Sequence, residues 1–517
     1  EIARLQFLRR TAEARGDIEL ASEVWAAIAL QRLRVHEVQG ALEAHLFAQK
    51  LTRDTSKMDW QLFEYCQRLS AARSPAFLEG CWVQEELQQL RQALLARGFC
   101  SKQLLEASGA RSVTDFALPG VNGKRLEAQL RGFHDSKSGE DREKASGLVD
   151  LARLFLLGRV LPISRVRDLL GPTCEVLLRL QVLAFVDGRE QEDTPVFAIV
   201  ALWPVEEDLL LVTDFEATFF SDDTEPVMYI SEDSLALAAA ASRAAGRCLD
   251  LCCGSGVQGI VALRRGADSV VFVDLNPRCL AFTRFNLAFN SLSHKSKGEF
   301  LVDLKASPPE LGSFDAVLVN PPFMPNPDCI ASGASTLFGD GGDTGEEVIS
   351  AAITLASERL LAPGGHLIAV SKAPNAEDLP QRLRSWWRQR LGGRAKIWLS
   401  PATEAERYLP TAKSNPLEAL RFQRGLRRLG VKSLSQVVLL IVATEEFEHF
   451  DASIVGPPRP GLWLDKDFLS SEVAKAVAMQ EVEMPGAWMG LEAGFFPDSF
   501  QGPSPLWKDT ASKLLFR

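Results

Sequence analysis

The sequence predicts an α/β protein whose C-terminal half is a doubly wound parallel sheet, preceded by helical and winged-helix-like units. Two observations lead to this prediction. From Ser231 onwards, short apolar runs of strand length alternate with helical periods, a pattern that builds a parallel sheet with helices on both faces. Before Ser231 the apolar residues follow helical spacing, and strand-like runs occur only near the end of that region.

The length and composition are those of a globular protein with two to four domains. The 517 residues are 46% apolar and 24% charged, which is enough for a sizeable core. A net charge of −10 and a pI of about 5.4 argue against broad, sequence-independent coating of nucleic acid, but they leave room for a local basic patch. The chain contains no apolar run of about 18 residues, so no membrane span is expected.

The nine cysteines and six histidines are scattered without metal-binding spacing. No two cysteines have the CxxC spacing of a zinc ribbon or finger, so no metal site is predicted. An odd number of irregularly spaced cysteines is typical of reduced thiols, and we therefore expect an intracellular, cytoplasmic protein. Targeting to an organelle is left open, because the chain begins with Glu1 rather than Met.

The regions that flank the alternating pattern divide into four predicted segments. Residues 1–98 form a helical extension, which is a possible docking region for a partner protein. Residues 99–147 form a small helical unit that ends in a charged linker. In residues 148–230 three helices precede a β-hairpin, which is the order of a winged helix, although a generic packing domain fits equally well. Residues 447–517 are rich in Pro, Gly and aromatic residues and are predicted to be an irregular tail along the folded body.

Residues 231–446 form the predicted α/β domain. The first strands and helices are expected to alternate at residues 247–251, 256–265, 269–274 and 277–290. Further strands are expected at residues 299–302, 315–319, 366–371, 396–400 and 437–443. This alternation predicts a parallel, doubly wound sheet.

A glycine-rich turn joins the first strand of this domain to its first helix. In CLDLCCGSGVQGI, the GxGxxG spacing is matched by Gly254, Gly256 and Gly259. Because Asp274 ends the next strand, this pattern taken alone fits a nicotinamide-dinucleotide site. Asp250, however, lies four residues before Gly254 and would repel a pyrophosphate. S-adenosylmethionine instead carries an ammonium group, which Asp250 could bind directly or through water, while the helix N-terminus faces the ligand's carboxylate.

The segment DLCCGSG resembles the DLGxGSG motif of class I methyltransferases, with Cys252 in place of the first glycine. The resemblance implies a Rossmann-like, doubly wound methyltransferase sheet of seven strands, with S-adenosylmethionine as cofactor. Asp274 would accept hydrogen bonds from the ribose hydroxyls. Asp303 would contact the adenine amino group, although it could instead be a loop carboxylate that caps a turn. The cofactor-binding residues implied in this way are Asp250, Cys252, Gly254, Ser255, Gly256, Asp274, Asn276, Asp303 and Asn320.

A second motif, in VLVNPPFMPNP, ends the fourth strand. It resembles the (Asn/Asp)-Pro-Pro-aromatic motif of methyltransferases that act on planar amino or amide nitrogens. The Asn320 side-chain oxygen and the Pro321 carbonyl could accept the two N–H groups of such a nitrogen, and Phe323 could stack on the flat acceptor. The prolines stiffen the loop, and the rate then comes mainly from alignment, without a strong base. The predicted catalytic residues are Asn320, Pro321, Pro322 and Phe323.

Further likeness narrows the group of related enzymes. The sequence GDGGDTGEEVISAAI follows the NPPF motif much as a DGGxxG loop does in release-factor glutamine methyltransferases. As a unit, residues 148–443 are also similar to bacterial proteins of unknown specificity that carry a small methyltransferase domain behind a helical or winged-helix-like one. Tyr229 and Ser231 lie where such proteins close over the cofactor, although core packing would explain these two residues as well.

Three acceptor classes use the NPPF motif, namely glutamine amides in proteins, adenine amino groups, and guanine amino groups in ribosomal RNA. The overall acidity favours a protein glutamine, as in a release factor. Two basic segments, residues 382–396 and 421–432, could hold RNA phosphates or an acidic partner, although solvated helix faces would explain them too.

We therefore predict an S-adenosylmethionine-dependent N-methyltransferase (EC 2.1.1) with a macromolecular substrate. A protein glutamine is the first choice of acceptor, and adenine or guanine in RNA or DNA is the alternative. A nicotinamide-dependent dehydrogenase would leave Asp250 and the NPPF motif unexplained. A non-catalytic interaction protein with a relic domain is a more distant alternative, and the retained motif residues count against it.

Overall fold

The computed structural model describes residues 2–34, 75–117, 119–185, 194–215, 225–241, 246–304, 311–327, 337–388, 392–405, 407, 416–444 and 450–454. Contacts divide the chain into two compact units, Glu1–Glu225 with Pro503–Arg517, and Pro226–Gly502. The domain bounds that we predicted within residues 1–230 stay a prediction. Of the predicted tail, residues 450–454 form a strand, and its other residues lie outside the described part of the chain. Within the described ranges, no helix combines the length and the apolar composition needed to cross a membrane.

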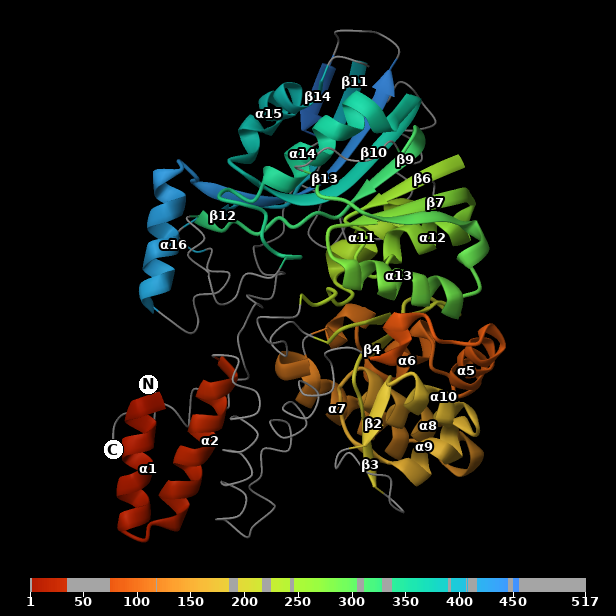
Figure 1. The fold of residues 1–517 in the computed structure, drawn as a ribbon, viewed down its shortest axis with the longest axis vertical. Helices are drawn as coiled ribbons and strands as arrows, with labels where there is room; N and C mark the ends of the chain where they lie inside the picture. Colours follow the sequence, from red (N-terminus) through yellow and green to blue (C-terminus); the bar gives the residue numbers. More distant parts are fainter. Residues whose placement is uncertain are drawn as a thin grey trace. The chain divides into compact units, whose positions relative to one another are not determined.

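The first unit begins with a pair of helices, α1 (Ile2–Ala14) and α2 (Ile18–Arg34), that contact each other (Figure 1). Apolar residues from both helices form a small core, which includes Leu5, Val24 and Ile28. Trp25 Nε1 donates a hydrogen bond to Glu13 Oε1 at 3.1 Å, which ties the second helix to the first. The helical prediction for the first 34 residues is thus confirmed, and residues 35–74 lie outside the described part.

The charged segment at residues 134–147, predicted as a linker, is mostly helical. Helices α7 (Pro119–Asp135) and α8 (Gly139–Phe155) meet at a break of three residues. Glu140 and Asp141 lie in the first turn of α8, where negative charge stabilises the helix macrodipole. The polar composition reflects the exposed first two turns of α8, whereas its second half is buried. The preceding helices are η2 (Ala76–Glu79), α5 (Gln84–Ala96), α6 (Ser101–Ser108) and η3 (Val113–Phe116).

After α8 the chain forms two further helices and a small antiparallel sheet. The elements are β1 (Leu161–Pro162), α9 (Ile163–Leu170), α10 (Thr173–Arg179), β2 (Leu183–Phe185) and β3 (Pro195–Ala198). The strands pair in the order β1-β3-β2. A separate hairpin follows, made of β4 (Ala201–Pro204) and β5 (Leu210–Thr213). Three helices thus precede a β2–β3 pair, and the assignment of this region as a winged helix stays a prediction.

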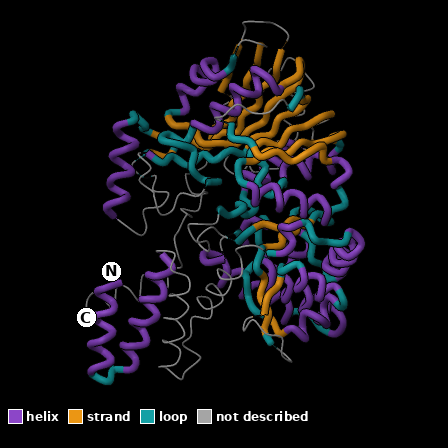
Figure 2. The backbone as a smooth tube through the Cα atoms, viewed as in Figure 1, coloured by secondary structure: helices purple, strands orange, loops and turns teal. Residues whose placement is uncertain are grey.

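The second unit is built on one mixed sheet, which has nine strands among the described residues (Figures 1 and 2). The strands are β6 (Gly246–Leu251), β7 (Ala267–Asp274), β8 (Ser296–Leu301), β9 (Phe314–Val319), β10 (Leu361–Pro374), β11 (Gly392–Leu399), β12 (Thr403–Glu404), β13 (Ser433–Thr444) and β14 (Phe450–Ile454). Their order is β14-β11-β13-β10-β9-β6-β7-β8, with β12 paired to β13. All pairs from β6 to β10 are parallel, whereas β13 is antiparallel to β10 and to β11.

This sheet differs from the predicted one in two respects. It has two strands more than the predicted seven, because the short strand β12 pairs with β13 and β14 extends the edge beside β11. Phe450 at the start of β14 packs on the Trp387 ring, with ring centroids 5.4 Å apart. The sheet is also not fully parallel. The chain returns from β11 through α16 without crossing to the other end of the sheet, so β13 must run antiparallel to its neighbours.

Helices cover both faces of the sheet. They are α11 (Glu232–Ala241), α12 (Val257–Arg265), α13 (Pro277–Phe289), α14 (Glu347–Leu355) and α15 (Leu379–Trp386). Helix α16 (Pro416–Arg428) packs instead beside β12 and the start of β13. One face packs against α14 and α15 in a continuous apolar core. On the opposite face α12 contacts β7, and α11 contacts β9 and β10. Burial on both faces explains the nearly continuous apolar runs of the central strands.

The order of the strands defines one position at which the chain reverses direction across the sheet. From β6 the chain proceeds to β7 and β8 on one side, and it then crosses back to β9 and β10 on the other side. The switch point therefore lies between β6 and β9. In open α/β sheets ligands bind outside the carboxyl ends of the strands at this point. The loops that follow β6 and β9 contain the two motifs singled out in the sequence.

Candidate functional site

The loop after β6 has three residues with positive φ within five positions. Cys252, Gly254 and Gly256 have φ values of 60°, 54° and 81°. Cys252 thus adopts the left-handed conformation of the glycine that it replaces, at a cost of about 1 kcal/mol for a residue with a Cβ atom. The substitution therefore leaves the shape of the loop intact. Gly256 is the N-cap of α12, so the first amide groups of that helix lie at the loop.

Gly259 allows α12 to approach the sheet closely. A Cβ atom at this position would clash with the Phe272 ring and would lie 2.9 Å from Val270 Cγ1 and 3.0 Å from Asp250 Oδ2. Real Cβ atoms essentially never show such distances. With glycine, the amide of residue 259 reaches the strand and donates a hydrogen bond to Asp250 Oδ2 at 2.8 Å. The third glycine of the motif therefore positions the carboxylate.

Asp250 has an unsatisfied oxygen atom. Its side chain is fully buried, Oδ2 accepts the bond from Gly259, and Oδ1 has no hydrogen-bond partner within the described part of the chain. Burial raises the pKa of Asp250 well above its usual range, the Gly259 amide opposes that shift, and the negative charge of Asp274 adds to it. A buried carboxylate in this state gains free energy from a cationic hydrogen-bond donor. The site thus fits an ammonium group.

Asp274 at the end of β7 accepts hydrogen bonds from the backbone amides of Gly254, Leu275 and Asn276 and from the Cys279 thiol. Its Oδ2 accepts from Gly254 N and its Oδ1 from Asn276 N, both at 2.9 Å. Burial raises the pKa of Asp274, and these hydrogen bonds oppose the shift. Asn276, predicted to contact a cofactor, uses its Oδ1 to accept the Arg278 amide and so caps α13.

Two exposed leucines next to Asp274 were missed by the sequence analysis. Leu275 directly follows β7 and is 45% exposed, and Leu301 ends β8 and is 57% exposed. Leu301 is the cross-strand partner of Asp274, so the two leucines flank that carboxylate. The sequence VDLNP places Leu275 at a strand end, where polar residues are usual, and this unusual position could have indicated an exposed leucine. The predicted Asp303 lies just beyond, exposed, in the loop after β8.

Asn320 directly follows β9, and its amide orientation is fixed. Its Nδ2 donates to Asp233 Oδ2 at 3.1 Å and lies 3.4 Å from Ser234 Oγ. Because a carboxylate only accepts hydrogen bonds, the nitrogen of the amide must face Asp233. Oδ1, which has no hydrogen-bond partner among the described residues, is thereby directed away from α11. Ser231 Oγ lies 2.9 Å from Ser234 Oγ and extends this network, whereas Tyr229 is buried.

The glycine-rich segment at residues 339–345 lies against the NPPF loop. Met324 and Asp340 form an isolated parallel bridge, and Asn326 Nδ2 donates to Asp340 Oδ2 at 2.7 Å. A Cβ atom on Gly345 would lie 2.6 Å from the Phe323 carbonyl oxygen. The segment therefore fixes the backbone of the NPPF loop from outside, and glycine is required for that close approach.

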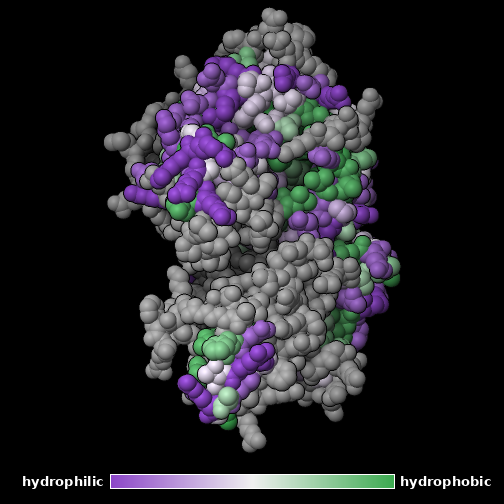
Figure 3. Space-filling view, turned by 60° about the vertical axis from the view of Figure 1, so that its left-hand side comes forward, coloured by the Kyte–Doolittle hydropathy of each residue, from purple (hydrophilic) through white to green (hydrophobic). Residues whose placement is uncertain are grey.

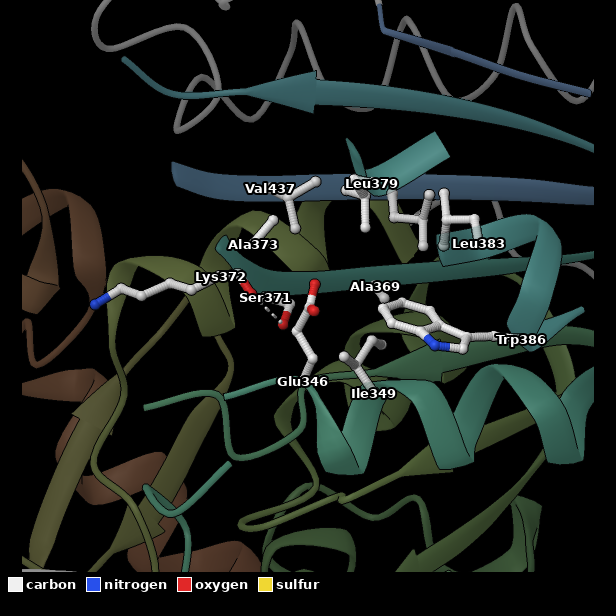
Figure 4. A pocket seen from close by; sticks show the side chains of 11 residues that line it. Glu346, Ile349, Ala369, Ser371, Lys372, Ala373, Leu379, Leu383, Trp386 and Val437 are labelled. Carbon is white, nitrogen blue, oxygen red and sulfur yellow. Dashed lines mark hydrogen bonds between the residues drawn. The ribbon is translucent and has the colours of Figure 1, made fainter. Parts of the chain in front are cut away.

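Lys372 near the end of β10 is a third residue that the sequence analysis missed. Its Nζ lies 5.7 Å from the centroid of the Phe323 ring and 3.6 Å from Met324 Sδ. Burial lowers the pKa of Lys372 to about 8, and the carboxylate of Asp233 opposes that shift. In Figure 4 the side chain of Lys372 points away from the pocket around Glu346. A basic residue that ends an apolar strand, as in HLIAVSK, is the pattern that could have indicated it.

The pocket in Figure 4 lies between β10, α14 and α15. Glu346 is buried there and pairs with Arg382 Nη2 at 2.9 Å. Burial raises the pKa of Glu346 to about 7, and the guanidinium of Arg382 opposes the shift. Arg384 in turn lies 3.8 Å from Asp451. Two of the six basic residues in the first basic segment, Arg382 and Arg384, thus have an acidic partner.

One family model and several solved structures match parts of the chain. The family model described as "Conserved hypothetical protein 95" matches residues 233–336, which carry both motif loops. A putative SAM-dependent methyltransferase from Streptococcus mutans has 15% identity, with 54% of this chain and 66% of that chain covered, at a TM-score of 0.29. A putative RNA methyltransferase from Pyrococcus horikoshii has 16% identity, with 41% and 81% covered, at a TM-score of 0.25. A predicted O-methyltransferase from Agrobacterium tumefaciens has 18% identity, with 44% and 86% covered, at a TM-score of 0.27. TM-scores this low are too weak to support an inference, so the function has to be inferred from the site itself.

Proposed function

We propose that the second unit is an S-adenosylmethionine-dependent methyltransferase that modifies a planar amide or amino nitrogen. The observation that carries the proposal is the presence of two polar side chains, Asp250 and Asn320, at the switch point of the sheet. Asp250 at the end of β6 presents a buried carboxylate oxygen that has no partner within the described ranges, and Asn320 at the end of β9 presents an amide oriented by Asp233. The two strands are neighbours in the sheet, so a donor and an acceptor molecule would meet between them.

The residues around Asp250 fit each part of the cofactor. Asp250 Oδ1 would bind the ammonium group, and the N-terminus of α12 would face the carboxylate. Asp274 would accept hydrogen bonds from the ribose hydroxyls, and Leu275 and Leu301 would cover the adenine. When bound, the cofactor supplies an electrophilic methyl group on a positive sulfur. A pyrophosphate would instead be repelled by the two buried carboxylates.

The NPPF loop fits the acceptor nitrogen. Asn320 Oδ1 and the Pro321 carbonyl would accept hydrogen bonds from its two N–H groups. The face of the nitrogen that attacks would then point toward the methyl group. Phe323 would lie against the flat group that carries the nitrogen. Asp233 and the glycine-rich segment hold this arrangement before the substrate binds, so alignment supplies most of the rate. No strong base is needed, because the methylated nitrogen loses its proton readily after transfer.

The sequence favoured a protein glutamine as the acceptor and a nucleic-acid base as the alternative. An exposed row of arginines on α16 favours the base. The winged-helix-like region of the first unit is compatible with either nucleic-acid contact or packing. Docking of a partner protein on the N-terminal helices stays a prediction, and Phe7 on α1 is exposed there.

Calorimetry with S-adenosylhomocysteine tests the proposal directly. The protein should bind it, and the absence of binding at millimolar ligand would exclude the cofactor and support a relic domain. Incubation with tritiated donor and separate pools of total RNA and total protein then identifies the acceptor class by the labelled fraction. Asn320→Ala should reduce transfer more than about 100-fold, the loss expected for about 3 kcal/mol of alignment. Its affinity for S-adenosylhomocysteine should stay within about threefold of the wild type, because Asn320 aligns the acceptor.

A further inference from the structure

Helix α16 has one buried side and one side made of arginines. Phe422 and Leu426 pack in a small cluster with Ala405, Val431 and Leu434. The exposed side carries Arg421, Arg424, Arg427 and Arg428. Figure 3 shows strongly hydrophilic side chains gathered over this helix. The buried cluster fixes the helix, so the arginines form a defined surface, which we call the arginine face.

The arginine face lies at the same edge of the sheet as the NPPF loop. Strand β13 starts where β10 ends, with Pro374 and Leu434 as cross-strand partners. Asn375 ties the two elements together, because its Nδ2 donates to Gly430 O at 2.9 Å and its Oδ1 accepts from Lys432 N at 2.8 Å. Three residues before Asn375, the ammonium group of Lys372 lies over the Phe323 ring. The end of α16 is thus joined to the strand that contacts the acceptor site.

The positive charge of this surface is local. Residues 421–432 include five basic residues and no acidic one, in a chain with a net charge of −10. In the earlier basic segment, Arg382 pairs with Glu346 and Arg384 lies 3.8 Å from Asp451. A polyanion would therefore be attracted to the arginine face and repelled by much of the remaining surface.

We propose that the arginine face binds the phosphate backbone of an RNA whose unpaired base enters the site at the NPPF loop. This inference rests on the proposed function and names its substrate class. Arg421, Arg424 and Arg428 follow helical spacing, so they form one row about 10 Å long at 1.5 Å per residue. Such a row can meet two or three consecutive phosphates, and guanidinium groups bind phosphates in a bidentate manner.

Two features favour RNA over the other polyanions. The acceptor nitrogen must leave any base stack to reach Asn320, and loops of RNA present bases that are already unstacked. The arginine face and the Phe323 ring lie at the same edge of the sheet, and together they would suit a nucleotide, which has both a phosphate and a flat base. An acidic protein would use the arginine face but would not need the Phe323 ring.

The test compares two double variants of the full chain that each remove two exposed arginines. Arg421→Gln with Arg424→Gln alters the arginine face. Arg265→Gln with Arg359→Gln alters the opposite edge of the sheet, where α12 ends and β10 begins. The probes are a fluorescein-labelled single-stranded RNA of about 20 nucleotides, the same sequence as DNA, and polyglutamate of similar charge. Fluorescence anisotropy at several salt concentrations gives the affinity and its salt dependence.

The arginine-face variant should bind the RNA about tenfold more weakly. The slope of log K against log salt should fall by about 1.4, because each lost contact with a single strand contributes about 0.7. The control variant should stay within about twofold of the wild type. Equal losses in both variants, tighter binding of polyglutamate, or equal binding of the DNA would overturn the proposal. Binding of S-adenosylhomocysteine distinguishes failure of this inference from failure of the proposed function. If the protein binds S-adenosylhomocysteine but the arginine-face variant binds RNA like the wild type, only the inference about RNA is wrong.

Discussion

Replacing Asp250 by Asn should change cofactor binding and stability in opposite directions. The buried side chain accepts the Gly259 amide with Oδ2, whereas Oδ1 has no partner among the described residues. An asparagine of the same shape would keep its oxygen on the Gly259 amide. Its Nδ2 would then occupy the position of the unpartnered oxygen and present a donor to the incoming ammonium group. The variant thus loses a charged hydrogen bond and gains a repulsive contact.

The size of both effects follows from the burial of this carboxyl group. A hydrogen bond between charged partners contributes about 1.5 to 3 kcal/mol, so a loss of about 3 kcal/mol weakens binding about 100-fold. In the absence of ligand, the substitution should increase the stability of the folded protein rather than decrease it. Burial raises the pKa of Asp250 in the folded state above its usual value of 3.8, so the folded protein holds that proton more tightly than the unfolded chain does. Its contribution to stability therefore falls as the pH rises from 3.8 through the raised pKa, and asparagine removes that loss.

Calorimetry with S-adenosylhomocysteine and urea unfolding between pH 5 and 8 would measure the two effects. Asp250→Asn should bind about 100-fold more weakly and, without ligand, should be at least as stable as the wild type at about pH 7. Asp268→Asn is the matched control, because Asp268 is exposed at the start of β7, away from the site. A change in affinity below about threefold, or a clear loss of stability in the unliganded variant, would refute the assignment of Asp250 to the ammonium group.

Three further changes test the surrounding structure. Gly259→Ala should lower the free energy of unfolding by about 2 kcal/mol in urea titrations because of the Phe272 clash, whereas Gly132→Ala, in a helix with open space around it, should raise it slightly. Asp233→Ala should lower kcat with little change in the affinity for S-adenosylhomocysteine, since it releases the Asn320 amide, and a loss that adds fully to that of Asn320→Ala would contradict this role. Lys372→Met should raise stability below about pH 8, where the buried ammonium is charged, and the gain should shrink as the pH rises toward 10.5; a gain independent of pH would contradict the lowered pKa.

Much of the fold could be predicted because local patterns report burial directly. The alternation of apolar runs and helical periods correctly predicted the parallel strands from β6 to β10 and their order along the chain. The strand count and the direction of β13 could not be predicted, because pairing partners depend on where α16 returns the chain. The segment at residues 134–147 was read as a linker from its charge, whereas a helix with a solvated face has the same composition.

The candidate site shows the same division at the level of single residues. The motif loops identified Asp250 and Asn320, because each loop follows a strand and its residue types fit one chemistry. Lys372 was missed, since it is separated by about fifty residues of sequence from the aromatic ring that it contacts. The two basic segments looked alike in sequence, and the ion pairs of Arg382 with Glu346 and of Arg384 with Asp451 could not be read from it.

The sequence by itself determined the local geometry of this protein. Local steric effects constrain the backbone at the glycines 254, 256 and 259, at the prolines 321 and 322, and along the strands. These constraints can be predicted without knowing which distant residues pack nearby. Only the tertiary structure decided which groups remain unsatisfied or exposed. The free oxygen of Asp250, the oriented amide of Asn320 and the arginine face of α16 all depend on atoms distant in the chain, because burial and pairing are properties of the packed whole.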